Sequence, residues 1–139
     1  MGGSSELKVL IIEESQVTAE ILKDFFLMTW KSNPLFFPTA RAAYDFLLEK
    51  AVETPPDIPD IVILDLGHSD KECMAVLRDI RNHDAMRFIP IIVRSSTDKL
   101  EVMLEIKKLD RVAYVRKKIG ESALTDTILK FRTLGFLKK

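Results

Sequence analysis

Short apolar runs alternate along the chain with longer segments in which apolar residues recur every three or four positions. The runs are nearly continuous and rich in β-branched residues, which is typical of strands buried on both faces of a sheet. They lie at residues 7–12, 61–64, 89–93 and 112–115, with a weaker candidate at 34–37. The pattern therefore predicts five strands, each followed by a segment with helical spacing.

Each predicted helix carries one stripe of apolar residues. The stripes are Val17, Ile21, Phe25 and Met28; Ala40, Tyr44 and Leu47; Cys73, Leu77 and Ile80; Val102, Ile106 and Leu109; and Leu124, Ile128 and Phe131. Helical crossovers between consecutive strands make the strands parallel and place helices on both faces of the sheet. The sequence thus predicts an α/β fold, a single doubly wound (βα)5 domain with a five-stranded parallel sheet.

Length and composition narrow the class of protein. A chain of 139 residues suits one domain, which we expect over residues 7–136, after a disordered or expression-derived stretch (1–6) and before a short tail (137–139). Twenty-one basic residues balance 21 acidic ones, so nothing favours nucleic acid as a direct partner. No apolar run is long enough for membrane insertion, and no signal peptide is evident, so we expect a cytoplasmic protein.

Polar residues gather where the predicted strands end. Glu13 and Glu14 follow the first strand, Asp65 ends the third, Ser95 the fourth and Lys117 the fifth. Ligands of parallel sheets bind at this edge. Clustered carboxylates repel one another unless a cation lies between them, and hard oxygen ligands suit Mg²⁺. A lysine and a hydroxyl group beside them suit a phosphoryl group.

Each of these residues also has a purely structural interpretation. Glu13 and Glu14 are favourable near a helix N-terminus, and Ser95 is an equally reasonable cap of the fourth helix. Asp65 alone is compatible with a turn cap, and Lys117 lies in a basic run of the kind that is usually solvated. The functional interpretation therefore depends on the residues acting together.

Three further residues are interpreted individually. Tyr114 suits the core, although a buried ring with a polar tip can also report a change at a neighbouring site. His68 is a lone loop histidine without an evident role, and Cys73 is expected to be a small core residue. The chain has no glycine-rich phosphate loop, zinc-ligand spacing or nucleophile elbow.

The strand-end residues resemble the pattern of receiver domains in bacterial two-component response regulators, the CheY-like family with a flavodoxin-like fold. That pattern has an acidic pair, then Asp, then Thr or Ser, then Lys with an aromatic residue three positions earlier, here Tyr114. The resemblance implies a phosphoacceptor signalling domain and not an enzyme with external substrates. Asp65 would accept a phosphoryl group, and Lys117 would pair with one of the phosphoryl oxygens.

The resemblance also implies a metal ion and a switch. Glu14, Asp65 and the backbone carbonyl of Gly67 would bind Mg²⁺ directly, and Glu13 would bind it through water. Ser95 would move toward the phosphoryl group while Tyr114 turns into the vacated space. This change would alter the face formed by the fourth helix, fifth strand and fifth helix. The implied partners are a histidine kinase or phosphotransfer protein, which supplies the phosphoryl group, and a downstream target protein.

Departures from the family pattern keep a second function open. Glu14 stands where Asp is usual, and its extra methylene group strains an octahedral Mg²⁺ site. "LGHSD" replaces the usual turn after Asp65, and Lys118 replaces the proline that usually follows the lysine. The alternative is a pseudo-receiver that acts as a phosphorylation-independent interaction scaffold. The fourth helix is also more apolar than one stripe requires, which favours a partner surface or a weak homodimer.

Overall fold

The protein folds as five parallel strands in one sheet with five helices, which confirms the predicted fold class. The computed structural model describes residues 6–67, 70–96, 99–117 and 120–137. Its strands, in the spatial order β2-β1-β3-β4-β5, are β1 (Val9–Ile12), β2 (Leu35–Phe37), β3 (Ile61–Leu66), β4 (Ile91–Ser95) and β5 (Val112–Arg116). The helices are α1 (Gln16–Trp30), α2 (Ala40–Ala51), α3 (Asp70–Asn82), α4 (Leu100–Lys107) and α5 (Ser122–Thr133).

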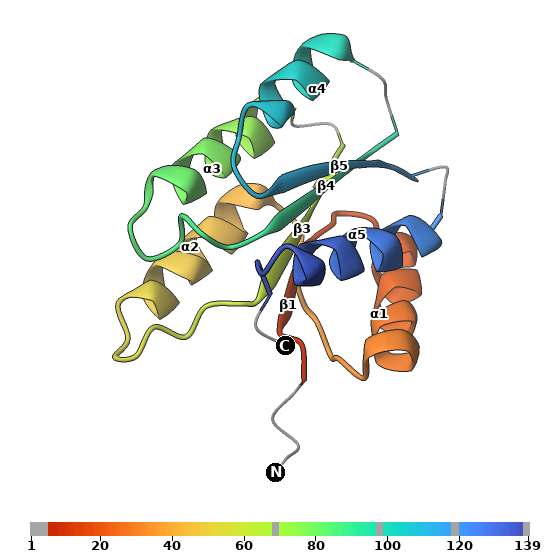
Figure 1. The fold of residues 1–139 in the computed structure, drawn as a ribbon, viewed down its shortest axis with the longest axis horizontal. Helices are drawn as coiled ribbons and strands as arrows, with labels where there is room; N and C mark the ends of the chain where they lie inside the picture. Colours follow the sequence, from red (N-terminus) through yellow and green to blue (C-terminus); the bar gives the residue numbers. More distant parts are fainter. Residues whose placement is uncertain (1–5, 68–69, 97–98, 118–119, 138–139) are drawn as a thin grey trace.

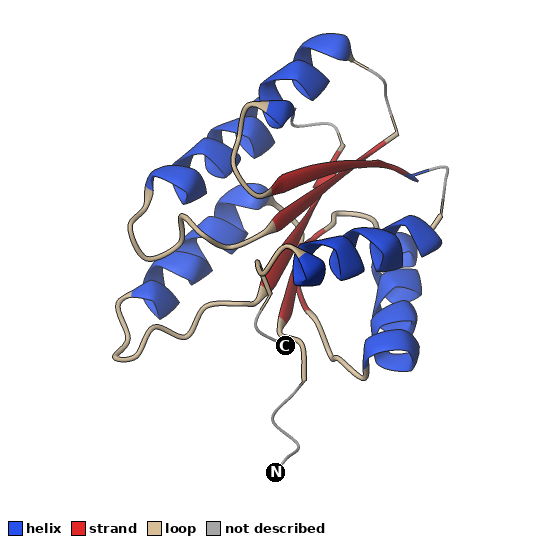
Figure 2. Ribbon diagram, viewed as in Figure 1, coloured by secondary structure: helices blue, strands red, loops and turns tan. Residues whose placement is uncertain are grey.

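The helices form a layer on each face of the sheet. Helices α1 and α5 cover one face, and α2, α3 and α4 cover the other (Figures 1 and 2). Each face has its own cluster of buried apolar side chains, and the central strand β3 is buried along its whole length. The edge strands β2 and β5 are more exposed. The predicted burial on both faces is therefore found in the inner strands and not in the two edge strands.

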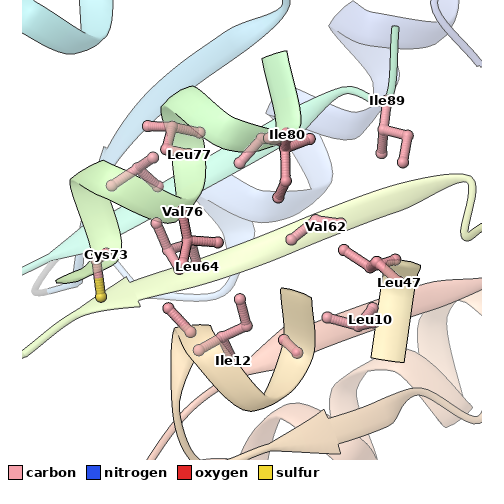
Figure 3. Packing of buried hydrophobic residues seen from close by; sticks show 14 of the residues in the cluster. Leu10, Ile12, Leu47, Val62, Leu64, Cys73, Val76, Leu77, Ile80 and Ile89 are labelled. Carbon is pink, nitrogen blue, oxygen red and sulfur yellow. The ribbon is translucent and has the colours of Figure 1, made fainter. Parts of the chain in front are cut away.

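The face under α2 and α3 is closely packed. Figure 3 shows Leu47 from α2 and Val76 and Ile80 from α3 lying against Leu10 and Val62 of the sheet. All five side chains are at most 2% exposed. Fully burying a residue of this kind stabilises a fold by about 1.5–3 kcal/mol, so this cluster holds the strand ends in fixed relative positions.

The predicted stripe of α1 is wrong. Val17, Ile21 and Met28 are 71%, 49% and 85% exposed, whereas Leu22 and Phe26 are at most 1% exposed. The α1 sequence contains two apolar stripes, and either one has helical spacing. The stripe with Leu22 and Phe26 is buried under the sheet.

The stripes predicted for α2, α3 and α5 are half-buried or buried as expected, and in α4 Ile106 is the buried residue.

Several boundaries also differ from the predicted ones. Strand β3 continues through Asp65 to Leu66, and β4 ends at Ser95, which is 1% exposed. Because Lys99 precedes the first residue of α4, Ser95 is not the cap of that helix. Beyond α5, Leu137 is buried in the cluster under α1 and α5, although we expected the tail to begin there.

Arg81 near the end of α3 ties three backbone segments together. Its Nε donates to the carbonyl oxygen of Asp110 at 2.5 Å, and its Nη2 donates to those of Ile89 and Arg111 at 2.6 and 3.0 Å. These carbonyl groups flank β4 and β5. Burial lowers the pKa of the guanidinium group to about 10, which still leaves it charged at neutral pH.

Replacing Arg81 with Met is expected to lower the free energy of unfolding by about 2–3 kcal/mol, because three hydrogen bonds to a charged donor are lost. Urea denaturation measures the change. Arg78→Met on the same helix is the matched control, since Arg78 forms an exposed pair with Glu105 and such pairs contribute about 0–1 kcal/mol. Equal losses in the two variants would contradict the proposed role of Arg81.

Candidate functional site

The acidic, basic and hydroxyl residues predicted for the site lie at the carboxyl edge of the sheet. Glu13 and Glu14 directly follow β1, Asp65 lies one residue before the end of β3, and Lys117 directly follows β5. Strands β1, β3, β4 and β5 are neighbours in the sheet, so their ends are adjacent although up to 104 sequence positions separate the residues involved. This adjacency results from the strand order.

Asp65 is a buried acid with a cationic partner. Its side chain is 7% exposed and forms an ion pair through Oδ1 with Nζ of Lys117. The thiol of Cys73 on α3 lies 3.7 Å from the backbone carbonyl oxygen of Asp65 and donates to it. A buried carboxylate is costly without such a partner. The lysine therefore explains how an acid is tolerated within a strand that is buried along its whole length.

Glu13 is the second buried acid of the site. It is 6% exposed, and its Oε2 accepts a hydrogen bond from the backbone N–H of Ser15 at 3.1 Å. Ser15 in turn caps α1 by accepting from the N–H of Thr18. Burial raises the pKa of Glu13, and the negative charge of Asp65 raises it further. Within the described residues its Oε1 is buried and accepts no hydrogen bond.

Glu14 approaches Asp65 across Gly67. A Cβ atom placed on Gly67 would lie 3.1 Å from Glu14 Oε1, which is tighter than an ordinary contact, and 3.6 Å from Asp65 Oδ2, so a larger residue would crowd the Glu14 carboxylate. The three residues line a small cavity of about 40 Å³. Glycine leaves the space between the two carboxylates open. A small ligand that binds both carboxylates would need this space.

The donor set suits a small, hard cation that keeps part of its water shell. The described residues contain no ready-made cluster of three or more His, Cys, Asp or Glu side chains arranged to hold a metal. Two carboxylates nevertheless flank the Gly67 cavity. The buried Oε1 of Glu13 accepts no hydrogen bond within the described residues, so it is available to a ligand. Mg²⁺ is commonly held by one or two carboxylates with several waters, so the residues fit this ion.

Ser95 and Tyr114 lie on the sheet face opposite Asp65. In the sheet register Ser95 is beside Leu66, and Tyr114 is beside Val93. Ser95 and Val93 are two positions apart on one strand, so Ser95 and Tyr114 share a face. Tyr114 is half-buried against the cluster under α2, α3 and α4. This neighbouring placement is compatible with coupled movement of the two side chains.

Sequence reasoning missed Arg94. This residue lies in β4 beside Asp65 in the register and is only 6% exposed. Its signal in the sequence is one basic residue directly after the apolar run "IPIIV". We predicted the strand to end at Val93, which would have placed the arginine in an exposed loop. Two other residues considered from the sequence, His68 and Lys118, lie outside the described residues.

Cys73 is predicted to be chemically inert in the folded protein. It is 6% exposed, and burial together with the nearby acids, Glu72 foremost, raises the pKa of its thiol to about 12. Because the thiolate is the reactive form, iodoacetamide at pH 8 should leave native Cys73 unmodified and alkylate it fully in urea. Mass spectrometry measures the modification. Rapid labelling of the native protein would show that α3 opens beside Asp65.

Comparison with known proteins agrees with this architecture. Residues 9–129 match the sequence family described as the response regulator receiver domain. The search of curated proteins gave no match. Among solved structures, the fold is similar to the phosphorylated cyanobacterial phytochrome response regulator RcpA, with 19% identity, a TM-score of 0.74 and coverage of 91% of this chain and 94% of that one.

Two further structures share the fold. Vibrio cholerae chemotaxis protein CheY4 is 16% identical, with a TM-score of 0.72 and coverage of 91% of this chain and 98% of that chain. The response regulator Rcp1, solved in a Mn²⁺-bound form, is 18% identical, with a TM-score of 0.68 and coverage of 96% of each chain.

The family match extends over most of the chain, and the order of the strands in the sheet agrees with it. The chain belongs to the response regulator receiver domain family, whose members are signalling domains of two-component systems rather than classical enzymes. Among the described helices, none is both long and apolar enough to cross a membrane.

Proposed function

We propose that this receiver domain accepts a phosphoryl group on Asp65 and passes the resulting change to a protein partner. The observation that carries the proposal is the ion pair between Asp65 and Lys117 at the carboxyl edge of the sheet. It places an anionic oxygen nucleophile beside a cation that can neutralise a phosphoryl oxygen. The family match supplies the class of reaction.

In the proposed step, a carboxylate oxygen of Asp65 attacks the phosphorus atom of the donor. A new O–P bond forms, and the bond from phosphorus to the donor breaks, with its electron pair leaving on the donor. The donor is a phosphohistidine of a kinase or phosphotransfer protein, or a small acyl phosphate. Positioning and charge stabilisation provide most of the catalysis in such transfers. Lys117 supplies one positive charge at the site.

Mg²⁺ is the proposed cofactor, and when bound it would neutralise charge between the carboxylates and the phosphoryl oxygens. Asp65 and Glu14 would hold it through the carboxylates that flank Gly67, and the backbone carbonyl of Gly67 would add a third oxygen. Glu13 would contact it through a water molecule, using the buried Oε1 that accepts no hydrogen bond within the described residues.

The proposed output surface is the face made by α4, β5 and α5. Ser95 would move toward the phosphoryl oxygens, and Tyr114 would turn toward the space that it leaves. On α4, Leu100 and Leu104 are 65% and 51% exposed, so the helix carries apolar side chains that a partner could cover. A downstream target protein or a second copy of the chain would bind there. We place the domain in the cytoplasm, where such kinases act.

The test is the intact mass of the protein after incubation with acetyl phosphate and Mg²⁺. We expect the mass of one phosphoryl group to be added and then lost on treatment with hydroxylamine, which cleaves acyl phosphates. Peptide mapping should locate the group in β3. No addition, under conditions that phosphorylate a responsive receiver domain, would favour the scaffold function. The observation that favours the scaffold function is the lack of a ready-made metal cluster among the described residues.

Lys117→Met is expected to slow phosphorylation of Asp65 by roughly a hundredfold, because removing one preorganised charge partner has an effect of that size. The time course of the mass change measures the rate. Lys117→Arg keeps the charge and should retain more of the activity than Lys117→Met. An unchanged rate in Lys117→Met would show that the ion pair serves the fold and not the transfer.

A further inference from the structure

Arg94 is a buried cation beside the phosphoacceptor. It lies in β4 opposite Asp65 on one side and Val115 on the other. The residues before it in the strand, Ile91 to Val93, are completely buried, and Arg94 itself is 6% exposed. A long basic side chain usually brings its charged end to the solvent. In Arg94, by contrast, two of the three guanidinium nitrogens, Nε and Nη1, are inaccessible to solvent.

The pleat of the sheet places Arg94 and Asp65 on the same face. Ile63 and Ile92, two residues before Asp65 and Arg94 respectively, both belong to the cluster under α1 and α5. Side chains two positions apart in a strand point to the same face, and neighbours in register lie side by side. The two charged side chains therefore leave neighbouring strands in the same direction.

Two of the three guanidinium nitrogens of Arg94 lack the acceptors that buried donors require. Its Nε and Nη1 atoms are inaccessible to solvent, and neither finds a hydrogen-bond acceptor in the part of the chain that the structure describes. A guanidinium group is always charged in proteins. The neighbouring carboxylate of Asp65 is already paired with Lys117. The unphosphorylated site thus contains a buried donor without an acceptor, which destabilises this state.

We infer that Arg94 is an anion-binding residue of the phosphorylation site, and that its acceptors are the phosphoryl oxygens on Asp65. The inference rests on the proposed function of Asp65. Phosphorylation adds negative charge and three acceptor oxygens on Asp65, the register neighbour of Arg94 in β3. Arginine donates charge-assisted hydrogen bonds to such oxygens, and Nε and Nη1 are two donors without an acceptor among the described residues.

This role has two separable consequences. In the unphosphorylated protein, Arg94 is a cost to stability, because its Nε and Nη1 donors are buried without acceptors among the described residues. In the phosphorylated protein, the same donors stabilise the anion. Arg94 therefore favours the phosphorylated form in two ways: it destabilises the unphosphorylated protein and stabilises the phosphorylated one. It also adds a second basic side chain to Lys117 in a site where Glu14 replaces the usual, shorter acid.

The test compares the wild type with Arg94→Met, which replaces the aliphatic stem but removes the guanidinium group, and with Arg94→Lys, which keeps the charge. The probe is beryllofluoride, a phosphoryl mimic that binds carboxylates, titrated by calorimetry in the presence of Mg²⁺. We expect beryllofluoride to bind Arg94→Met about tenfold more weakly than the wild type, the loss typical of one charge-assisted interaction. Arg94→Lys should lie between them. Without the probe, Arg94→Met should resist urea at least as well as the wild type.

The outcomes distinguish a failure of this inference from a failure of the proposed function. Equal beryllofluoride affinity in the wild type and Arg94→Met, with both chains phosphorylated by acetyl phosphate, would overturn the role of Arg94 and leave that of Asp65 standing. A large loss of urea resistance in Arg94→Met without the probe would also overturn the inference, because Arg94 would then serve the fold. A wild type that gains no phosphoryl mass and binds no beryllofluoride overturns both proposals.

Discussion

Asp65→Asn is expected to abolish phosphorylation by acetyl phosphate while leaving the protein folded. Asparagine has nearly the shape of aspartate, but its amide oxygen is not an anionic nucleophile and cannot form a stable acyl phosphate. The substitution also removes the anion that pairs with Lys117. Lys117 is a quarter exposed, so water can solvate its charge in the variant. We therefore expect a complete loss of the mass gain with only a small change in thermal stability.

Asp79→Asn is the matched control for this result. Asp79 is an exposed acid on α3, and a nitrogen of Arg41 lies 3.9 Å from its carboxylate. This variant should gain one phosphoryl group like the wild type. A mass gain that persists in Asp65→Asn would place the acceptor on another residue, and Glu13 and Glu14 would be the first to replace. Circular dichroism of both variants checks that their folds are intact.

Phe26→Ala is expected to lower the free energy of unfolding by about 3–5 kcal/mol, the usual cost of removing a buried aromatic ring. Phe26 is completely buried, and its ring meets that of Phe25 edge-on with 5.0 Å between centroids. Helix α1 has only one other buried residue, Leu22, so no neighbour on that helix can replace the lost contacts. A domain of this size is stable by about 5–15 kcal/mol, so the loss is a large fraction of the total.

Met28→Ala on the same helix is the comparison that tests which face of α1 is buried. Met28 is 85% exposed, and the substitution should change the free energy of unfolding by less than about 0.5 kcal/mol. Urea denaturation measures both variants. If Met28→Ala proved as destabilising as Phe26→Ala, the stripe predicted from the sequence would be the buried one after all.

The number and order of the elements were determined by the sequence. Short β-branched runs separated by helical spacing favour a parallel sheet covered by helices, because each helix must bury its stripe against the sheet. The strand ends carry the polar residues, and parallel strands bring their carboxyl ends to one edge. The convergence of Asp65 and Lys117 follows from these local patterns together with the order of the strands, and the structure contains this pair.

Other features were decided only by the tertiary structure. Periodicity is a local property, so it could not choose between the two apolar stripes of α1; burial beneath the sheet chose the stripe with Phe26. The sequence also could not show that Ser95 belongs to β4 rather than to a helix cap, because strand length depends on pairing with neighbouring strands. The environment of Arg94 depends on the register of three strands that are distant in sequence. Pairing between β3 and β4 sets a buried cation beside Asp65, and no pattern within "IPIIVRSS" contains that information.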